Sequence, residues 1–153
     1  MCRHVKHALV LKIENNHVIV NRNTSWEIDA KSRDLTINAL SVDFDGTLYD
    51  YVDGISDIKN QLVKFCPNPI PKIKQDPNQL LRWYKAIGLF ENPKWLKKDK
   101  QLVQKYLPML RDVKDEKRTK LELAGFLAMP SSKTVFALMC KMGADKYLDL
   151  NCS

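Results

Sequence analysis

The pattern of apolar residues changes near residue 70, and this change limits the possible folds more than any other feature of the sequence. Before it, the apolar runs are short and β-rich, whereas after it apolar residues recur every three to four positions, as in helices. Pro67, Pro69 and Pro71 stand at the change, and proline interrupts both strands and helices. We therefore predict an α+β chain with an antiparallel, strand-containing part at residues 1–66 and a helical part at residues 70–150.

Turn signals divide the strand-containing part into two hairpins and a helix–strand pair. Glu14-Asn15-Asn16 separates two β-rich runs, and Asp45-Gly46 suits the positive φ angles of a tight hairpin turn. Ser56 is a suitable N-cap for a short helix. The expected strands are Val5–Ile13, His17–Arg22, Leu40–Phe44, Thr47–Tyr51 and Leu62–Phe65, and the expected helix is Ser56–Gln61.

The helical part contains start and stop signals for four helices. Asp76-Pro77 starts the first, because Asp accepts from free backbone N–H groups and Pro is tolerated in the first turn, and Gly88 ends it. The later helices are expected at Asp99–Leu107, Asp115–Met129 and Lys133–Met142. The residues expected to be buried are Leu80, Leu81, Tyr84, Ile87, Leu102, Val103, Tyr106, Leu121, Leu123 and Phe126.

The composition is that of one globular domain with a preference for polyanions. The chain has 153 residues, of which 44% are hydrophobic and 28% charged, and it has no apolar run of the roughly 18–20 residues that cross a membrane. The formal net charge is +7. Lysines concentrate in one stretch, at Lys59, Lys64, Lys72, Lys74, Lys85, Lys94, Lys97, Lys98 and Lys100. This favours a nucleic-acid partner, since neutralised phosphates release counterions, and a solvated lysine-rich surface is the alternative.

The four cysteines, Cys2, Cys66, Cys140 and Cys152, are far apart and include no Cys-x-x-Cys pair. We predict reduced thiols and, because no secretory signal is visible, an intracellular location. The basic first dozen residues are similar to an organelle-import segment, but their alternating apolar residues favour a strand.

One short motif has two interpretations. The run from Val42 to Leu48 resembles the nucleophile motif of haloacid-dehalogenase-type phosphatases, which implies Asp43 as nucleophile and Asp45 as acid and base. That chemistry needs Mg²⁺ held by further carboxylates from a later strand. Asp145 and Asp149 have a suitable spacing, but they follow a helical segment, and too few residues remain to complete a doubly wound sheet. The simpler interpretation is a hairpin turn.

A longer match, in several pieces, resembles class II CCA-adding tRNA nucleotidyltransferases and the related bacterial poly(A) polymerases. Arg33-Asp34-Leu35-Thr36-Ile37-Asn38 is similar to the family signature Arg-Arg-Asp-Phe/Leu-Thr-Ile-Asn. Further pieces follow in the family's order, at Phe44–Leu48, Gly54, Asp57–Asn60, Gln75–Arg82, and Asp115 with Arg118 and Glu122. The resemblance covers about residues 17–150. It implies an incomplete nucleotidyltransferase-type palm, the end of the catalytic head, followed by an all-α neck.

The resemblance implies a nucleotide pocket near the junction of head and neck. Arg33 and Asp34 stand at the family's pocket positions, where the planar fork of an arginine suits phosphate oxygens, and a helix-end ion pair is the alternative for Arg33. Asp76 stands where the family has a base-reading carboxylate, although it is also a good N-cap. Gln79 replaces the base-reading arginine, and Arg82 follows one turn later.

The resemblance also implies tRNA as substrate, CTP and ATP as nucleotides, and Mg²⁺. In the family, an Asp-x-Asp pair ahead of the matched segment binds the metal. Residues 1–16 contain no aspartate and one glutamate, Glu14, so we predict no catalytic and no metal-binding residues in this chain. We expect a fragment or degenerate member that is inactive alone, either mitochondrial or cytoplasmic. The alternative is a non-catalytic RNA-binding module, and an unpaired sheet edge would favour self-association.

Overall fold

The computed structural model describes the backbone of residues 3–5, 8–13, 16–21, 25–113, 116–127, 129 and 131–148. Side chains are described from residue 25 onward within these ranges, except at positions 116, 118 and 127. The predicted α+β class is confirmed, with short strands mainly in the first half and helices in the second.

Three strands near the N-terminus form an antiparallel sheet in the order β1-β2-β3. Their bounds are Arg3–Val5, Ala8–Ile13 and Asn16–Asn21. The predicted hairpin of two strands is confirmed, since β2 pairs with β3 from Ala8 opposite Asn21 to Ile13 opposite Asn16. The single long first strand of the prediction is instead two strands, β1 and β2.

A short helix and a hairpin follow. Helix α1 (Trp26–Lys31), which was not predicted, starts where the Ser25 hydroxyl accepts a hydrogen bond from the Ile28 N–H. The turn η1 (Thr36–Asn38) leads to β4 (Ser41–Val42), which pairs antiparallel with β5 (Leu48–Tyr49). Gly46 has φ +87° in the turn between them, as the sequence predicts for Asp45-Gly46.

Helix α2 (Gly54–Lys59) begins two residues before the predicted start. Ser56 is therefore not its N-cap. The Asp50 carboxylate instead accepts hydrogen bonds from the backbone N–H groups of Val52, Gly54 and Ile55 at 3.1, 2.9 and 2.9 Å. Gly54 also allows a close approach to η1, because a Cβ there would lie 2.4 Å from the Thr36 carbonyl oxygen.

One strand pair departs from the predicted antiparallel pattern. Strand β6 (Leu62–Val63) pairs in parallel with β7 (Lys94–Trp95), which lies 32 residues later between two helices. This pairing ties the strand-containing half to the helical half.

The helical half contains six helices and one 3₁₀ turn within the described residues. Their bounds are Pro69–Gln75 (α3), Gln79–Ile87 (α4), Lys97–Tyr106 (α5), Leu107–Leu110 (η2), Glu116–Leu127 (α6), Ser132–Met142 (α7) and Asp145–Leu148 (α8). The four predicted helices correspond to α4, α5, α6 and α7, and Gly143 ends α7 at φ +81°. Helix α3 was missed because its prolines were interpreted as interruptions, whereas Pro69 lies in the first turn, where its missing N–H costs nothing. Helix α4 starts at Gln79 rather than at Asp76-Pro77.

The main hydrophobic core surrounds α4. Leu80, Leu81, Tyr84 and Ile87 are buried as predicted, and Trp83 is fully buried beside them. Val103 and Phe126 are also buried, and Leu102, Tyr106 and Leu123 are partly buried. The prediction is wrong for Leu121, which is 64% exposed. Helix α6 has a weakly separated apolar face, so its sequence alone does not fix which side faces the core.

The core crosses the predicted boundary between the two parts of the chain. Leu35, Val63 and Phe65 come from the strand-containing half and pack in the same cluster as the helices. A smaller cluster joins Ala30, Ala39 and Cys66. The division into two domains at residues 66–70 therefore stays a prediction, because both parts of the chain contribute to one hydrophobic core.

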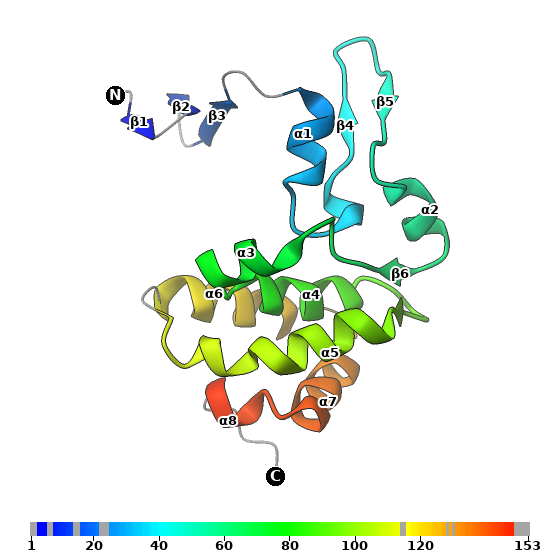
Figure 1. The fold of residues 1–153 in the computed structure, drawn as a ribbon, viewed down its shortest axis with the longest axis vertical. Helices are drawn as coiled ribbons and strands as arrows, with labels where there is room; N and C mark the ends of the chain where they lie inside the picture. Colours follow the sequence, from blue (N-terminus) through cyan, green and yellow to red (C-terminus); the bar gives the residue numbers. More distant parts are fainter. Residues whose placement is uncertain are drawn as a thin grey trace.

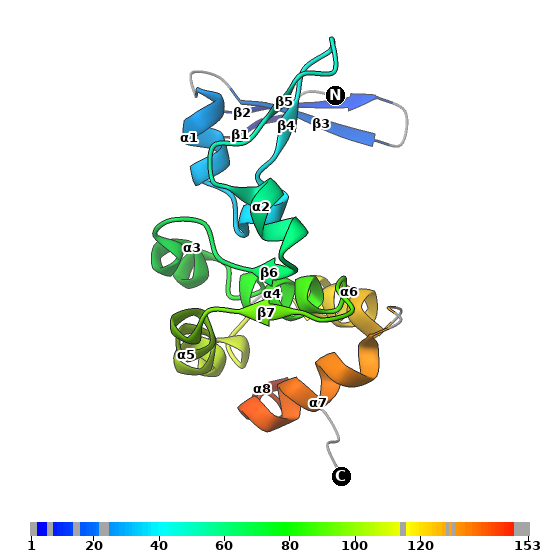
Figure 2. The ribbon, with the colours of Figure 1, turned by 90° about the vertical axis from the view of Figure 1, so that its right-hand side faces the viewer.

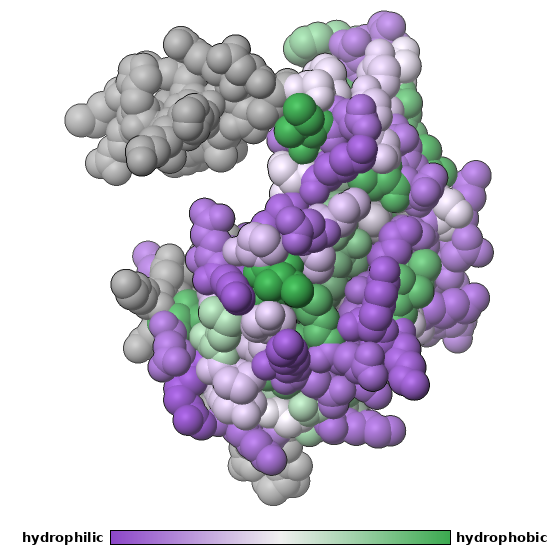
Figure 3. Space-filling view, viewed as in Figure 1, coloured by the Kyte–Doolittle hydropathy of each residue, from purple (hydrophilic) through white to green (hydrophobic). Residues whose placement is uncertain are grey.

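The elements from α1 to α8 form two tiers. In Figures 1 and 2, α1, the β4–β5 hairpin and α2 lie above the helical layer, and β6 lies at the junction. Figure 3 shows that hydrophilic residues cover most of one face, with apolar residues in small separate areas. No helix in the described part of the chain has the length and apolar character needed to cross a membrane.

The cysteine prediction is correct for one residue and wrong for another. Cys66 is a free, buried thiol, and burial raises its pKa to about 11. Cys140 is disulfide-bonded, contrary to the prediction. Distance along the sequence does not report distance in the fold, so spacing alone could not decide this.

Candidate functional site

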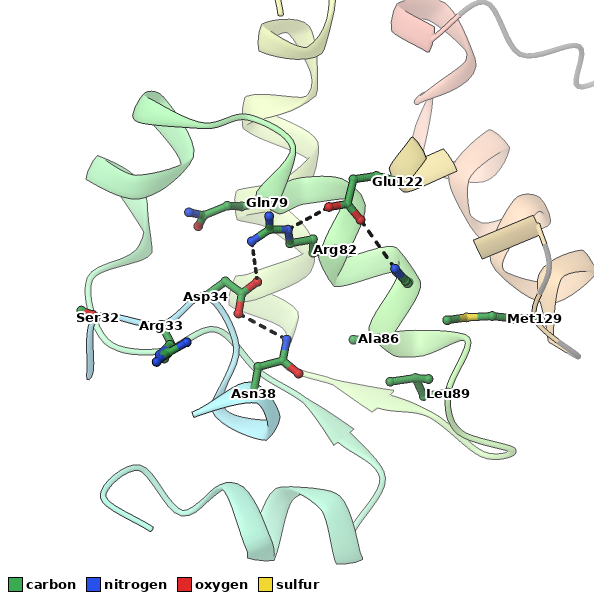
Figure 4. Close-up of a pocket in the computed structure, with 11 residues that line it drawn as sticks. Ser32, Arg33, Asp34, Asn38, Gln79, Arg82, Ala86, Leu89, Glu122 and Met129 are labelled. Atoms are coloured by element: carbon green, nitrogen blue, oxygen red, sulfur yellow. Dashed lines mark hydrogen bonds and ion pairs between the residues drawn. The ribbon is translucent and has the colours of Figure 1, made fainter. Parts of the chain in front are cut away.

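A cavity of about 540 Å³ lies where the residues after α1 meet α4 and α6 (Figure 4). Its size is typical of small-molecule sites. The lining residues are Ser32, Arg33, Asp34, Asn38, Gln79, Arg82, Lys85, Ala86, Leu89, Glu122 and Met129. Four of the five predicted site residues are therefore brought together.

Arg82 joins the three segments that form the cavity. Its Nε donates to Glu122 Oε1 at 3.1 Å, and its Nη1 donates to Asp34 Oδ2 at 3.4 Å (Figure 4). Burial lowers the pKa of Arg82, but the Glu122 hydrogen bond and the negative charges of Asp34 and Glu122 outweigh this and raise it. The guanidinium is thus a fixed positive charge, held in place by two carboxylates.

Asp34 is held by its neighbours as well as by Arg82. Its Oδ1 accepts from the Leu35 N–H at 2.8 Å and from Asn38 Nδ2 at 3.3 Å. The side chain is 10% exposed. Each oxygen of this carboxylate therefore has a fixed direction at the edge of the cavity.

Arg33 lines the cavity but also makes the ion pair considered as the alternative. Its Nε and Nη2 donate to Asp29 Oδ2 at 3.0 and 2.6 Å, one turn earlier on the chain. The Arg33 side chain is 52% exposed. Lys72 Nζ donates to the Lys31 and Arg33 carbonyl oxygens at 3.0 and 2.9 Å, which fixes the end of α1 against α3.

Gln79 and Asp76 behave differently from each other. Gln79 lines the cavity one turn before Arg82, and its Oε1 is buried without a hydrogen-bond partner in the described part of the chain. Asp76 does not line the cavity. It ends α3, and its Oδ1 accepts from the Asn78 N–H at 3.2 Å, a local bond of the kind expected from a capping residue.

Several lining residues were not predicted as site residues. Glu122 holds Arg82 and lies 3.7 Å from Lys85 Nζ. Gln79, Arg82, Lys85 and Leu89 are spaced at three to four residues and so share one face of the α4 segment. That spacing was the available signal for Lys85, whereas no local signal places Glu122 opposite a residue 40 positions earlier.

Carboxylates suited to a metal ion do not gather in the described residues. No group of three or more His, Cys, Asp or Glu side chains there is arranged to hold a metal ion, so these residues do not fit a two-metal centre. The phosphatase residues Asp43 and Asp45 lie in the β4–β5 turn, where they accept from the Phe44 and Thr47 N–H groups. Asp145 begins α8, and Asp149 lies outside the described residues, so the phosphatase hypothesis stays untested.

The strand-containing half matches the model of a known protein family. The family model described as Poly A polymerase head domain matches residues 5–64. The mitochondrial CCA tRNA nucleotidyltransferase 1 of Mus musculus is 40% identical over 75 residues, which cover 49% of this chain and 17% of that protein. The CCA-adding enzyme of Bacillus velezensis is 32% identical over 122 residues, 78% of this chain and 30% of that enzyme. The chain therefore spans less than a third of the length of these relatives.

The fold agrees over nearly the whole chain. The Bacillus stearothermophilus CCA-adding enzyme in complex with CTP matches with a TM-score of 0.78 at 20% identity, covering 93% of this chain and 38% of that one. The Thermotoga maritima CCA-adding enzyme complexed with tRNA also has a TM-score of 0.78, at 18% identity, covering 96% of this chain and 37% of that one. These likenesses show the fold. Together with the head-domain match and the sequence relatives, they show that the chain belongs to the CCA tRNA nucleotidyltransferase and poly(A) polymerase family.

Proposed function

We propose that the Arg82 cavity binds CTP and ATP, and that the protein to which this chain corresponds adds CCA to the 3′ ends of tRNA. The observation that carries the proposal is Arg82, held between Asp34 and Glu122 at the edge of a cavity that also contains Gln79. The CTP and tRNA bound to solved relatives of the same fold support it.

The side chains at the cavity suit the bases of both nucleotides. Cytosine and adenine each present an amino donor beside a ring-nitrogen acceptor, whereas uracil and guanine present a carbonyl beside an N–H. A fixed carboxylate next to a fixed guanidinium matches the first pattern and opposes the second. Asp34 and Arg82 form such a pair, and the Gln79 amide adds a donor and an acceptor. We infer that these residues, rather than Asp76, read the base.

We further propose that the isolated chain binds nucleotides without transferring them. Nucleotidyl transfer by two metal ions needs closely placed carboxylates, and the described residues do not supply them. Mg²⁺ therefore enters no step that we derive for these residues. A mitochondrial or cytoplasmic location is part of the same proposal, on the strength of relatives such as the mitochondrial mouse enzyme.

A binding module for RNA is the second candidate function, and the lysine-rich stretch from Lys59 to Lys100 favours it. Both functions involve RNA, but only the first requires nucleotide selection at Arg82. Retention of tRNA that weakens steeply with added salt would support RNA binding in either case.

Calorimetric titration of the full chain with the four nucleoside triphosphates tests the pocket. We expect CTP and ATP to bind more tightly than UTP and GTP, and Arg82→Gln to remove this preference. The matched control is Arg111→Gln, because Arg111 lies outside the cavity and contacts the Tyr147 ring at 5.3 Å. Equal binding of all four nucleotides, or an equal loss in both variants, would contradict the proposal.

A labelled CTP and ATP incorporation assay on tRNA lacking its 3′ end tests the inactivity of the isolated chain. We expect no incorporation, even when titration shows binding. Incorporation that depends on added Mg²⁺ would overturn this part of the proposal and leave the nucleotide pocket intact.

A further inference from the structure

A second cavity, of about 550 Å³, shares no lining residue with the Arg82 cavity. It is formed by the end of α1, the residues before α2, the segment from β6 to α3, and the start of α5. In Figure 2, α3 lies between the level of α1 and the level of α5. The volume is within the roughly 300–1,000 Å³ of small-molecule sites.

Two carboxylates on the wall of this cavity have unused hydrogen-bonding capacity. Asp99, in the first turn of α5, is 4% exposed, and the Phe65 N–H, at 3.3 Å from Oδ2, is the one donor to this carboxylate among the described residues. Burial raises the pKa of Asp99 more than the Phe65 hydrogen bond and the charge of Lys98 lower it. Asp53 is exposed, and its side chain neither caps α2 nor makes an ion pair with a described residue. A carboxylate accepts about four hydrogen bonds when fully satisfied, so both can accept from a ligand.

Three lysines line the same cavity, and two of them already have acidic partners. Lys64 Nζ lies 2.8 Å from Asp57 Oδ2, and Lys31 pairs with Glu27. Lys98 makes no ion pair within the described part of the chain. Lys98 is therefore the cation that is left for a ligand.

The charges that remain define the class of ligand. Once the two lysine pairs are set aside, the wall has two carboxylates and one ammonium group. A ligand that is only anionic would be repelled by both carboxylates, and a ligand that is only cationic would leave the ammonium group without a partner. A ligand with two cationic groups and one anionic group satisfies all three. A basic amino acid has this set, in its α-ammonium, its carboxylate and its side-chain cation.

The positions of the three groups in the chain match their order in such a ligand. Lys98 and Asp99 are adjacent at the start of α5, as the carboxylate and the ammonium are adjacent on an α-carbon. Asp53 and Tyr51 lie on a different wall, in the segment before α2. There, a carboxylate and a 37%-exposed aromatic ring both attract a cation.

We propose that this cavity binds a basic amino acid, lysine or arginine. The α-ammonium donates to Asp99, the ligand carboxylate accepts from Lys98, and the side-chain cation lies at Asp53 beside Tyr51. The proposal depends on the second cavity alone and does not rest on nucleotide binding at Arg82.

The test is a calorimetric titration of the full chain with lysine and three analogues, each of which lacks one charged group. ε-Aminocaproate lacks the α-ammonium, cadaverine lacks the carboxylate, and norleucine lacks the side-chain ammonium. Lysine is expected to bind about tenfold more tightly than ε-aminocaproate, because a charged hydrogen bond to the buried Asp99 carboxylate contributes about that factor. It is expected to bind about threefold more tightly than the other two, since Lys98 and Asp53 are exposed and their ion pairs are weaker.

Three substitutions assign each preference to one residue. Asp99→Asn should reduce the preference over ε-aminocaproate to less than about twofold, because the remaining acceptor is uncharged. Lys98→Gln should do the same for cadaverine, and Asp53→Asn for norleucine, a change that the φ of 64° tolerates. Lys100→Gln is the matched control, since Lys100 lies on the same helix but does not line the cavity. Thermal melts verify that each variant is folded.

The comparison of analogues needs only the wild-type chain, so it decides the proposal even if a variant does not fold. No lysine binding at millimolar concentration, or equal binding of lysine and all three analogues, would overturn it. Cadaverine binding as tightly as lysine would also overturn it and indicate a diamine site. Preferences unchanged in both Asp99→Asn and Lys98→Gln would place the binding elsewhere and contradict the proposal. Titration with CTP and ATP tests the Arg82 cavity separately.

Discussion

Large apolar side chains are exposed in the region of α1 and the β4–β5 hairpin, whereas they are buried in the region around α4. Trp26 and Val42 are 56% and 63% exposed, whereas Trp83 and Tyr84 are fully buried. The two regions also differ in charge. Residues 25–58 contain the acids Glu27, Asp29, Asp34, Asp43, Asp45, Asp50, Asp53 and Asp57, against the two bases Lys31 and Arg33. The lysine-rich stretch begins immediately afterwards.

The two regions derive their stability from different interactions. Around α4, stability comes from apolar burial, at about 25 cal/mol per Å² removed from water. In the hairpin region, carboxylates such as those of Asp50 and Asp45 accept hydrogen bonds from backbone N–H groups a few residues away. Little apolar surface is buried there.

The largest expected effect is in the core. Trp83→Ala should lower the free energy of unfolding by about 3–5 kcal/mol, because it removes a buried ring that packs edge-on against Tyr84 and Trp95 at 5.3 and 6.1 Å. Urea unfolding measures this. Trp83→Phe should cost much less, since Trp83 Nε1 has no hydrogen-bond partner to lose among the described residues. A small loss for Trp83→Ala would mean that apolar burial around α4 is not the main source of stability.

The next effect is at the junction of the two regions. Arg82→Gln should lower the free energy of unfolding by about 1–3 kcal/mol, because Asp34 and Glu122 then lose their charged donor at 10% and 16% exposure. Arg111→Gln, in an exposed position, should change it by less than about 0.5 kcal/mol. Chemical denaturation of the two variants side by side checks the prediction, and equal losses would mean that the Arg82 pairs add nothing.

Two carboxylates, one in each region, should respond to pH in opposite directions. Burial raises the pKa of Asp50, but the N–H groups of Ile55, Gly54 and Val52 outweigh it and lower the pKa below 3.8. Its stabilisation is therefore present above about pH 4 and is lost as pH falls through the folded-state pKa. Asp50→Asn should cost about 1 kcal/mol at pH 7 and much less at pH 3, as for a lost helix cap.

For Asp99 the sign is reversed. Its folded-state pKa is raised above 3.8, so folding favours the protonated form, and stability is lost as pH rises from about 4 through the folded-state pKa. Asp99→Asn should therefore flatten this loss. Unfolding curves at pH 3 to 7 measure both variants, and parallel pH profiles for Asp50→Asn and Asp99→Asn would contradict the assignment.

The smallest effect is expected on the exposed aromatic surface. Trp26→Ala should change the free energy of unfolding by less than about 0.5 kcal/mol, because Trp26 is largely exposed and, among the side chains that the structure describes, stacks only on Tyr49 at 6.4 Å. Acrylamide should quench the Trp26 emission more than that of Trp83. A loss above about 2 kcal/mol would show that this surface is covered in solution and would remove the contrast between the regions.

Local signals predicted most of the secondary structure. The hairpin turn at Asp45-Gly46, the end of α7 at Gly143 and the buried face of α4 depend on residues adjacent in the sequence, and all three are as predicted. The start of α2 was misplaced, because the Asp50 side chain caps it from outside the helix. Leu121 was misassigned because α6 has no strongly apolar face.

Part of the candidate site lies in the local family signature. Arg33 and Asp34 lie in that signature, and both line the cavity together with Gln79 and Arg82. Asp76 does not line it, since it ends α3 and bonds its own backbone neighbour. Glu122 stands in the last matched piece of the family pattern, but it was absent from the predicted site because nothing in its local sequence indicates a contact with Arg82.

Patterns within a few neighbouring residues suffice to predict the family, the α+β class and the position of the change from strands to helices. Packing between distant segments determines which side of α4 faces the cavity, that Glu122 holds Arg82, and that Asp99 is buried beside Phe65. Those outcomes require segments 34 to 40 residues apart to pack together, and the energy that brings them together belongs to the shared core rather than to any one segment.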